Sequence, residues 1–191
     1  QPYEAPFDDS DGDIVLRSSD GVDFRLYTVI LRKASHTFHD LFTTPGLTSS
    51  DLTRDGLPVI SLSDDARTLR LLLRHIYPVA GPELTDPDDV RALLRALDKY
   101  CITSQIAASE RLVLGLAERA PELAYALACR FRLPAEVARR AARLTLRKPA
   151  GLAVLSEEDA AHVPGLQYHR LLAYQSRAVT AAAHAVKTFA W

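Results

Sequence analysis

The sequence has few cysteines, no long apolar run and almost no net charge. It holds two Cys and one Trp among 191 residues, so a disulfide framework has no basis, and we expect two reduced, buried thiols in an intracellular protein. No apolar run approaches the roughly 18 residues of a membrane-spanning helix, so no transmembrane helix is predicted. Lys and Arg number 23 against 24 Asp and Glu, so no net charge draws the chain to nucleic acid or membrane.

Met is also absent, even from position 1, so we expect a processed or trimmed chain that leaves room for flanking domains. The N-terminus QPYEAPFDDSDGD is acidic and contains Pro, which is unlike a secretory signal. Because residues 1–12 are polar and acidic, they are predicted to form a flexible lead-in.

The sequence motifs of enzymes are missing as well. There is no G-x-S-x-G nucleophile elbow, no G-x-G-x-x-G and no phosphate-binding Walker loop. Cys101 is placed on the apolar side of a predicted helix, where its thiol would be protonated and inert. We therefore predict no catalytic activity and no cofactor.

Two groups of residues resemble metal sites, and neither is complete. His36 and His39 share a helix face beside Asp40. These residues do not supply the third and fourth ligands that a tetrahedral site needs. A calcium-loop spacing fails at Ile14, where the loop requires Gly; its first acids would be Asp9, Asp11 and Asp13. No metal site is predicted.

The strand patterns lie in the first third of the chain. DIVLRS and DFRLY alternate apolar and polar residues, and the Asp20-Gly21 pair between them predicts a two-residue turn with positive φ. LPVISL predicts a third strand. Later segments have helical spacing of apolar residues, which predicts an α+β fold with a small sheet clasped by helices and followed by a helical tail. Helices are expected at 28–35, 36–43, 66–76, from 87, at about 104–120, from 121, from 134, from 156 as a short turn, and from 166 toward the C-terminus.

Cap residues predict where several of these helices begin. Asp64 or Asp65 precedes the helix at 66, and Asp86 precedes the helix at 87. Ser156 with Asp159 three residues on forms a capping box. The last helix has an apolar stripe that predicts a buried face, made of Leu171, Leu172, Ala178, Val179, Ala182 and Val186.

Three segments together resemble the BTB/POZ family: DIVLRSSDGVDFRLYTVILRKASHTFHDLF at 13–42, LPVISLSDDARTLRLLLRHIYP at 57–78 and VRALLRALDKYCI at 90–102. They include a Ser-x-x-Phe step from Ser35 to Phe38, an Ile76-Tyr77 pair and an A-x-x-K-Y helix end at Tyr100. The resemblance implies a BTB/POZ domain over 13–118 and a BACK-like helical extension over 119–191. The Ile-Tyr-Pro ending and the long loop before LPVISL resemble the fungal branch of the family.

The resemblance implies a non-catalytic protein–protein interaction module. In the family the first strand and first helix often form a two-fold dimer interface, which here would use Ile14, Leu16, Val29 and Ile30; each could equally be monomer core. A second partner is implied, either a cullin scaffold of a ubiquitin ligase or a co-regulator in a transcription-related scaffold. Docking would involve Tyr77, Tyr100 and the loop 43–56.

Two positions depart from the family pattern. Tyr27 stands at the end of the second strand, where the family usually has His, and the loop 43–56 lacks the Glu of an apolar-x-Glu element. The missing Glu counts against cullin recruitment.

A basic stretch, CRFRLPAEVARRAARLTLRKP, follows in the predicted extension. Arg139, Arg143 and Arg147 fall in one line on a helix, which fits either a solvated face or a docking face for an acidic partner or for the chain's own acidic lead-in. Nucleic-acid binding is not expected, because motifs for base readout are absent.

Overall fold

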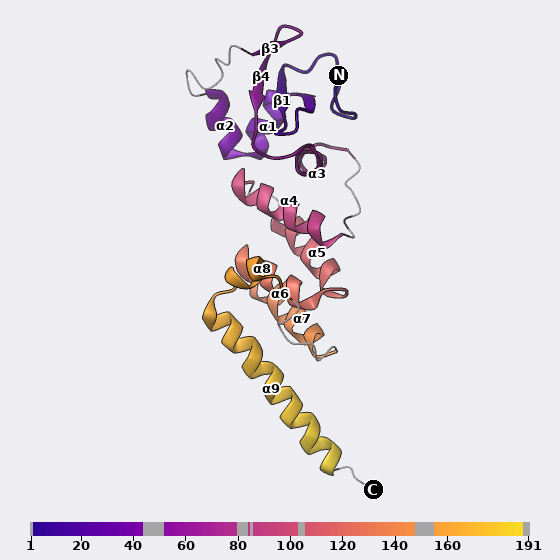
Figure 1. The fold of residues 1–191 in the computed structure, drawn as a ribbon, viewed down its shortest axis with the longest axis vertical. Coiled ribbons are helices and arrows are strands. Elements are labelled where there is room, and N and C mark those ends of the chain that lie inside the picture. Colours follow the sequence, from indigo (N-terminus) through magenta and orange to yellow (C-terminus); the bar gives the residue numbers. More distant parts are fainter. Residues whose placement is uncertain are drawn as a thin grey trace. The chain divides into compact units, whose positions relative to one another are not determined.

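The computed structural model describes residues 2–43, 52–79, 84, 86–102, 106–147 and 155–188. The chain forms two compact units, Gln1–Gln105 and Ile106–Trp191. Within the described residues every strand lies in the first unit, and the second unit is helical (Figure 1). The predicted α+β class is therefore confirmed.

The sheet of the first unit has the order β2-β1-β4-β3. The central strand β1 (Ile14–Arg17) pairs antiparallel with β2 (Asp23–Leu26) and parallel with β4 (Leu57–Ser61). The short β3 (Thr53–Arg54) pairs antiparallel with β4 in a segment that the sequence predicts as loop. Strand β1 is buried on both of its faces, as expected for a central strand with a parallel neighbour.

The turn between β1 and β2 is longer than the predicted two-residue turn. The Gly21 N–H donates to the Ser18 carbonyl at 3.0 Å, and the Ser18 N–H donates to the Val22 carbonyl at 2.9 Å. Gly21 has a φ of 83°, whereas Asp20 is not among the positive-φ residues. The Asp20 carboxylate instead accepts from the Ala66 N–H at 2.9 Å.

Four helices complete the first unit: α1 (Thr28–Ala34), α2 (His36–Thr43), α3 (Ala66–Ile76) and α4 (Pro87–Lys99). The Asp65 carboxylate accepts from the Thr68 N–H at 2.8 Å, and the Asp86 carboxylate accepts from the Asp88 N–H at 2.9 Å. Both predicted caps are therefore confirmed, with Asp65 as the cap of α3.

The N-terminal residues are packed, in contrast to the predicted flexible lead-in. Phe7 is 1% exposed, and its carbonyl accepts from the Arg25 N–H of β2 at 2.7 Å. The Phe7 ring lies 6.0 Å from that of Phe24 and 5.5 Å from that of Tyr77. Phe7 thus anchors the N-terminal segment to the sheet, a contact that the acidic composition of the segment does not predict.

The second unit contains α5 (Ile106–Ala117), α6 (Pro121–Arg130), α7 (Ala135–Thr145), α8 (Glu157–Ala161) and α9 (Gly165–Thr188). Helix α6 is its centre, since residues 121–128 are all buried. Pro121 is the first residue of α6, and Pro134 immediately precedes α7. The Ser156 hydroxyl accepts from the Asp159 N–H at 3.1 Å, which confirms the predicted cap.

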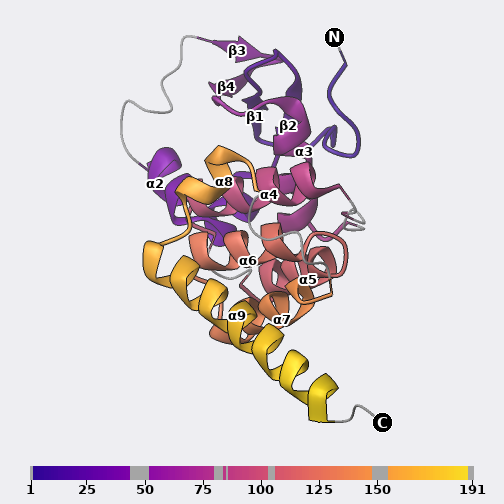
Figure 2. The same ribbon diagram turned by 60° about the horizontal axis from the view of Figure 1, so that its bottom comes forward.

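Helix α9 lies along α6 and α7 only through its first half (Figure 2). The Tyr125 hydroxyl donates to the Gln167 carbonyl at 2.7 Å, and the Gln175 amide donates to the Thr145 hydroxyl at 3.0 Å. Leu171 alone of the described α9 residues is buried. The predicted buried stripe is wrong beyond it, because Leu172, Val179 and Val186 are exposed.

Candidate interaction surfaces

The residues predicted for a dimer interface fall into two environments. Ile14 and Leu16 are 1% and 0% exposed, because β1 lies between two strands with both faces covered. Val29 on α1 is 55% exposed, and Ile30 is half-buried. Ile14 and Leu16 therefore belong to the core of the single chain, and of these four residues only Val29 on α1 is exposed.

The start of α1 is fixed by a carboxylate from the strand region. Asp13 accepts from the Thr28 N–H at 2.7 Å and from the Thr28 hydroxyl at 2.6 Å. A carboxylate there satisfies a free N–H of the first turn and complements the positive end of the helix. The exposed Val29 is thus held on a helix with a defined beginning.

Tyr27 binds the acidic N-terminal segment. Its hydroxyl donates to Asp11 and, at 3.3 Å, to Asp9. The hydrogen bond to Asp11 raises the pKa of Tyr27 well above 10, and the same bond lowers the pKa of Asp11. The described residues contain no group of three or more His, Cys, Asp or Glu side chains that could hold a metal ion.

The two tyrosines predicted for partner docking support the fold. The Tyr77 hydroxyl accepts from the Tyr27 N–H at 2.9 Å, and burial raises the pKa of Tyr77 to about 12. Tyr100 is 4% exposed, with its ring stacked on Phe38 at 4.8 Å and its hydroxyl donating to Asp64. Burial also raises the pKa of Tyr100. Tyr100 therefore offers almost no surface to a partner.

The Ser-x-x-Phe step joins two distant segments. The Ser35 hydroxyl donates to the Tyr100 carbonyl at 2.5 Å and accepts from the Phe38 N–H at 3.0 Å. Ser35 is 2% exposed, so these bonds satisfy a buried hydroxyl. The motif positions α2 against the end of α4.

A buried ion cluster lies at the turn end of the β1–β2 hairpin, where Arg17 pairs with Asp23. The Asp23 carboxylate is 3% exposed and accepts from Arg17 Nε at 2.6 Å and from Arg54 Nη1. The hydrogen bond from Arg17, followed by that from Arg54, holds the pKa of Asp23 below its ordinary value despite burial. The cluster is internally paired, and the sequence gives no local signal for it because Arg54 is 31 positions away.

The remaining candidates for chemistry are isolated. His36 Nδ1 lies 3.0 Å from Asp40 Oδ2, and both side chains are exposed to solvent. Cys101 is exposed with a φ of 50°, which corrects the prediction that it lies on an apolar helix face. Cys129 is half-buried, and burial raises the pKa of its thiol.

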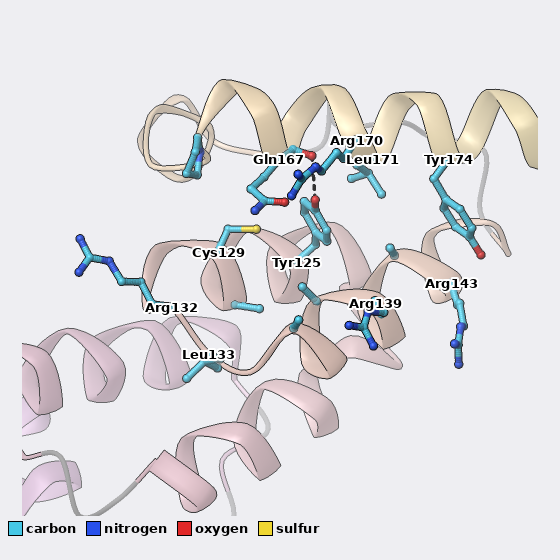
Figure 3. A pocket seen from close by; sticks show the side chains of 15 residues that line it. Tyr125, Cys129, Arg132, Leu133, Arg139, Arg143, Gln167, Arg170, Leu171 and Tyr174 are labelled. Atoms are coloured by element: carbon cyan, nitrogen blue, oxygen red, sulfur yellow. Dashed lines mark hydrogen bonds between the residues drawn. The ribbon is translucent and has the colours of Figure 1, made fainter.

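The second unit contains a pocket of about 760 Å³ between α6, α7 and α9 (Figure 3). Arg139 and Arg143 line it from α7, and Arg170 and Tyr174 line it from α9. Arg147 does not line the pocket; its guanidinium pairs with Glu118 at 3.0 Å. Two of the three arginines predicted in one line therefore lie at the pocket.

The sequence gives no sign that α9 completes this site. Arg170 and Tyr174 are four residues apart, so they share a helix face, but they are separated from the α7 arginines by a predicted break and a short helix. Their approach depends on how α9 docks, which the Tyr125 to Gln167 bond fixes.

A family model for the BTB/POZ domain matches residues 7–114, more than half of the chain. The chain belongs to the BTB/POZ domain family. A comparison with curated proteins finds no match. BTB/POZ domains are protein–protein interaction modules that mediate homo-oligomerisation and partner binding.

The BTB match begins at Phe7, the anchor of the N-terminal segment, and ends within α5. The sequence instead predicts a domain over 13–118, and the compact units meet between Gln105 and Ile106. Helix α5 thus belongs partly to the family match and wholly to the second compact unit. Among the described residues, no helix combines the length and hydropathy needed to cross a membrane.

Proposed function

We propose that this chain is a non-catalytic interaction module that self-associates through its BTB domain and recruits a second protein. Six carboxylates among the described residues hold backbone N–H groups, arginines or a tyrosine within the chain, so each has a role in the fold: Asp13, Asp20, Asp23, Asp64, Asp65 and Asp86.

The observation that carries self-association is the exposure of Val29. Its side chain is 55% exposed on a helix anchored by Asp13, above a strand whose apolar residues are already buried. A helix face that meets its own copy across a two-fold axis would bury Val29 against its equivalent. The proposed interface therefore centres on α1, with Ile30 at its edge.

Light scattering over a concentration series tests this interface. We expect the native chain to reach twice its mass of 21.0 kDa, and Val29→Glu to stay at 21.0 kDa, because the interface would bury an unpaired charge. Leu52→Glu is the matched control, since Leu52 is 53% exposed in the same unit. A native chain that remains monomeric at high concentration contradicts the proposal.

The recruited partner is proposed to be either a cullin scaffold or a co-regulator. A cullin adaptor would use the loop 43–56, which lies largely outside the described residues, and Tyr100, which is buried. A transcription-related scaffold would bind a co-regulator. A pull-down with a cullin N-terminal domain separates the two, since absence of binding at micromolar concentration removes the adaptor role.

The proposal also includes an intracellular location, in cytoplasm or nucleus, and the likeness of the chain to fungal BTB proteins with a BACK-like extension. Its two cysteines are free, as suits a reducing compartment. Broad esterase and phosphatase screens test the absence of enzymatic activity, and a reproducible turnover lost on unfolding would overturn it.

A further inference from the structure

The pocket of the second unit combines an apolar floor with basic walls. Small and apolar side chains from all three helices and their connections form the floor: Ala128, Leu133, Ala135, Ala138, Ala142 and Leu171. Arg132, Arg139, Arg143 and Arg170 line the same space. Figure 3 shows Arg139 and Arg143 along α7, with Tyr174 reaching from α9 toward that side.

The positive charge of this pocket is largely uncompensated. Among the described residues, none of those that line it is acidic. Arg139 pairs with Glu136 at 2.8 Å, but both side chains are 64% exposed, where such a pair contributes little. In the part of the chain that the structure describes, no ion pair is found for Arg132, Arg143 or Arg170. Residues 106–191 hold 12 Lys or Arg and only 7 Asp or Glu.

Tyr125 and Cys129, which also line the pocket, offer little for recognition of a charged occupant. The Tyr125 hydroxyl already donates to the Gln167 carbonyl at 2.7 Å (Figure 3). Burial raises the pKa of the Cys129 thiol. An occupant would therefore meet guanidinium groups and the Tyr174 side chain above an apolar floor. Guanidinium groups bind carboxylates through paired N–H donors.

We propose that this pocket binds a short acidic segment of a partner protein, with one or two apolar side chains on the alanine-rich floor and flanking carboxylates on Arg139, Arg143 and Arg170. The inference rests on the proposed role in partner recruitment, but it is independent of self-association. A peptide fits better than a nucleic acid, because Glu118 pairs with Arg140 and Arg147 and so interrupts the basic surface that a phosphate backbone would follow.

Fluorescence anisotropy with three labelled probes tests the proposal on the whole chain. The probes are a peptide of Glu-Glu-Leu repeats, the same peptide with Lys in place of Glu, and a single-stranded DNA of equal length. We expect the acidic peptide alone to bind, and added salt to weaken it. Arg139→Glu combined with Arg143→Glu should lower its affinity at least about tenfold, because two attractive contacts become repulsive.

The control variants distinguish the effect of charge reversal in the pocket from the effect of charge reversal elsewhere on the chain. Arg140 lies on the same helix, α7, but does not line the pocket. The affinity of Arg140→Glu for the acidic peptide should stay within about twofold of that of the native chain. Arg170→Glu tests the opposite wall and serves if the α7 double variant does not fold by circular dichroism. Absence of acidic-peptide binding, equal binding of DNA, or equal losses in Arg140→Glu and Arg170→Glu would each overturn the proposal.

Light scattering on the same samples keeps the two proposals apart. A dimer that does not bind the acidic peptide defeats this inference alone. A monomer that binds it defeats self-association alone.

Discussion

Asp23 shows how a single charge is used inside the fold. Its carboxylate is 3% exposed and paired with Arg17 and Arg54. We expect Asp23→Asn to lower the free energy of unfolding by about 2 kcal/mol in urea denaturation, because two arginines lose a charged acceptor. Asp40 forms an exposed pair with His36 on α2, so Asp40→Asn should change the free energy of unfolding by less than about 0.5 kcal/mol.

The same residue predicts an acid dependence. Arg17 holds the folded pKa of Asp23 below the ordinary value of 3.8, so the unfolded carboxylate takes up its proton first as the pH falls. Its stabilisation is complete above about pH 5 and is lost as the pH drops through the folded pKa. The loss of stability in acid should therefore be smaller in Asp23→Asn than in the native chain, and parallel curves would contradict this assignment.

Tyr100 makes a second prediction at the residue scale. Tyr100→Phe keeps the ring stacked on Phe38 but removes the hydroxyl that donates to Asp64. We expect a loss of about 1 to 2 kcal/mol in the free energy of unfolding. Tyr168→Phe is the control, because Tyr168 is 44% exposed; an equal loss in both variants would argue against a specific role for the buried hydroxyl.

At the scale of elements, two glycines should respond in opposite directions to Ala. Gly21 closes the β1–β2 hairpin with a φ of 83°, so Gly21→Ala should cost about 1 kcal/mol from backbone strain. Gly115 lies inside α5 with no atom near an added Cβ, so Gly115→Ala should gain about 0.5 to 1 kcal/mol. Thermal unfolding of the two variants gives the signs of the two changes, and a stabilising Gly21→Ala would contradict the positive φ of Gly21.

The elements that the sequence predicts well are those with local signals. The starts of α3 and α4 follow from Asp65 and Asp86, whose carboxylates reach N–H groups two or three residues ahead. The packed N-terminal segment was missed because Phe7 contacts β2 and Tyr77, far along the chain. The exposed second half of α9 was missed because an apolar stripe does not reveal whether anything covers it.

The candidate sites, too, were predicted only where their residues are neighbours in the sequence. The alternation of β1 gives no means of telling an apolar core from an apolar interface, and the structure buries Ile14 and Leu16 while leaving Val29 exposed. The basic spacing of α7 was visible from the sequence, whereas the pocket also needs Arg170 from α9.

At the scale of the whole molecule, self-association predicts a concentration-dependent stability. If folded chains pair, the midpoint of thermal unfolding should rise with protein concentration by mass action. The midpoint of Val29→Glu should not depend on concentration, while that of Leu52→Glu should behave as in the native chain. A midpoint independent of concentration in all three would be inconsistent with pairing of folded chains.

The parallel pairing of β1 with β4 has a consequence for the time course of folding. Val15 lies opposite Val59, and the Asp20 side chain reaches the start of α3 from 46 positions away. These contacts require the closure of a long loop before any of them forms. The second unit is held mainly between helices that are neighbours in sequence, from α5 to α7. The native contacts of the second unit should therefore form first. The strands of the sheet should reach their native register later.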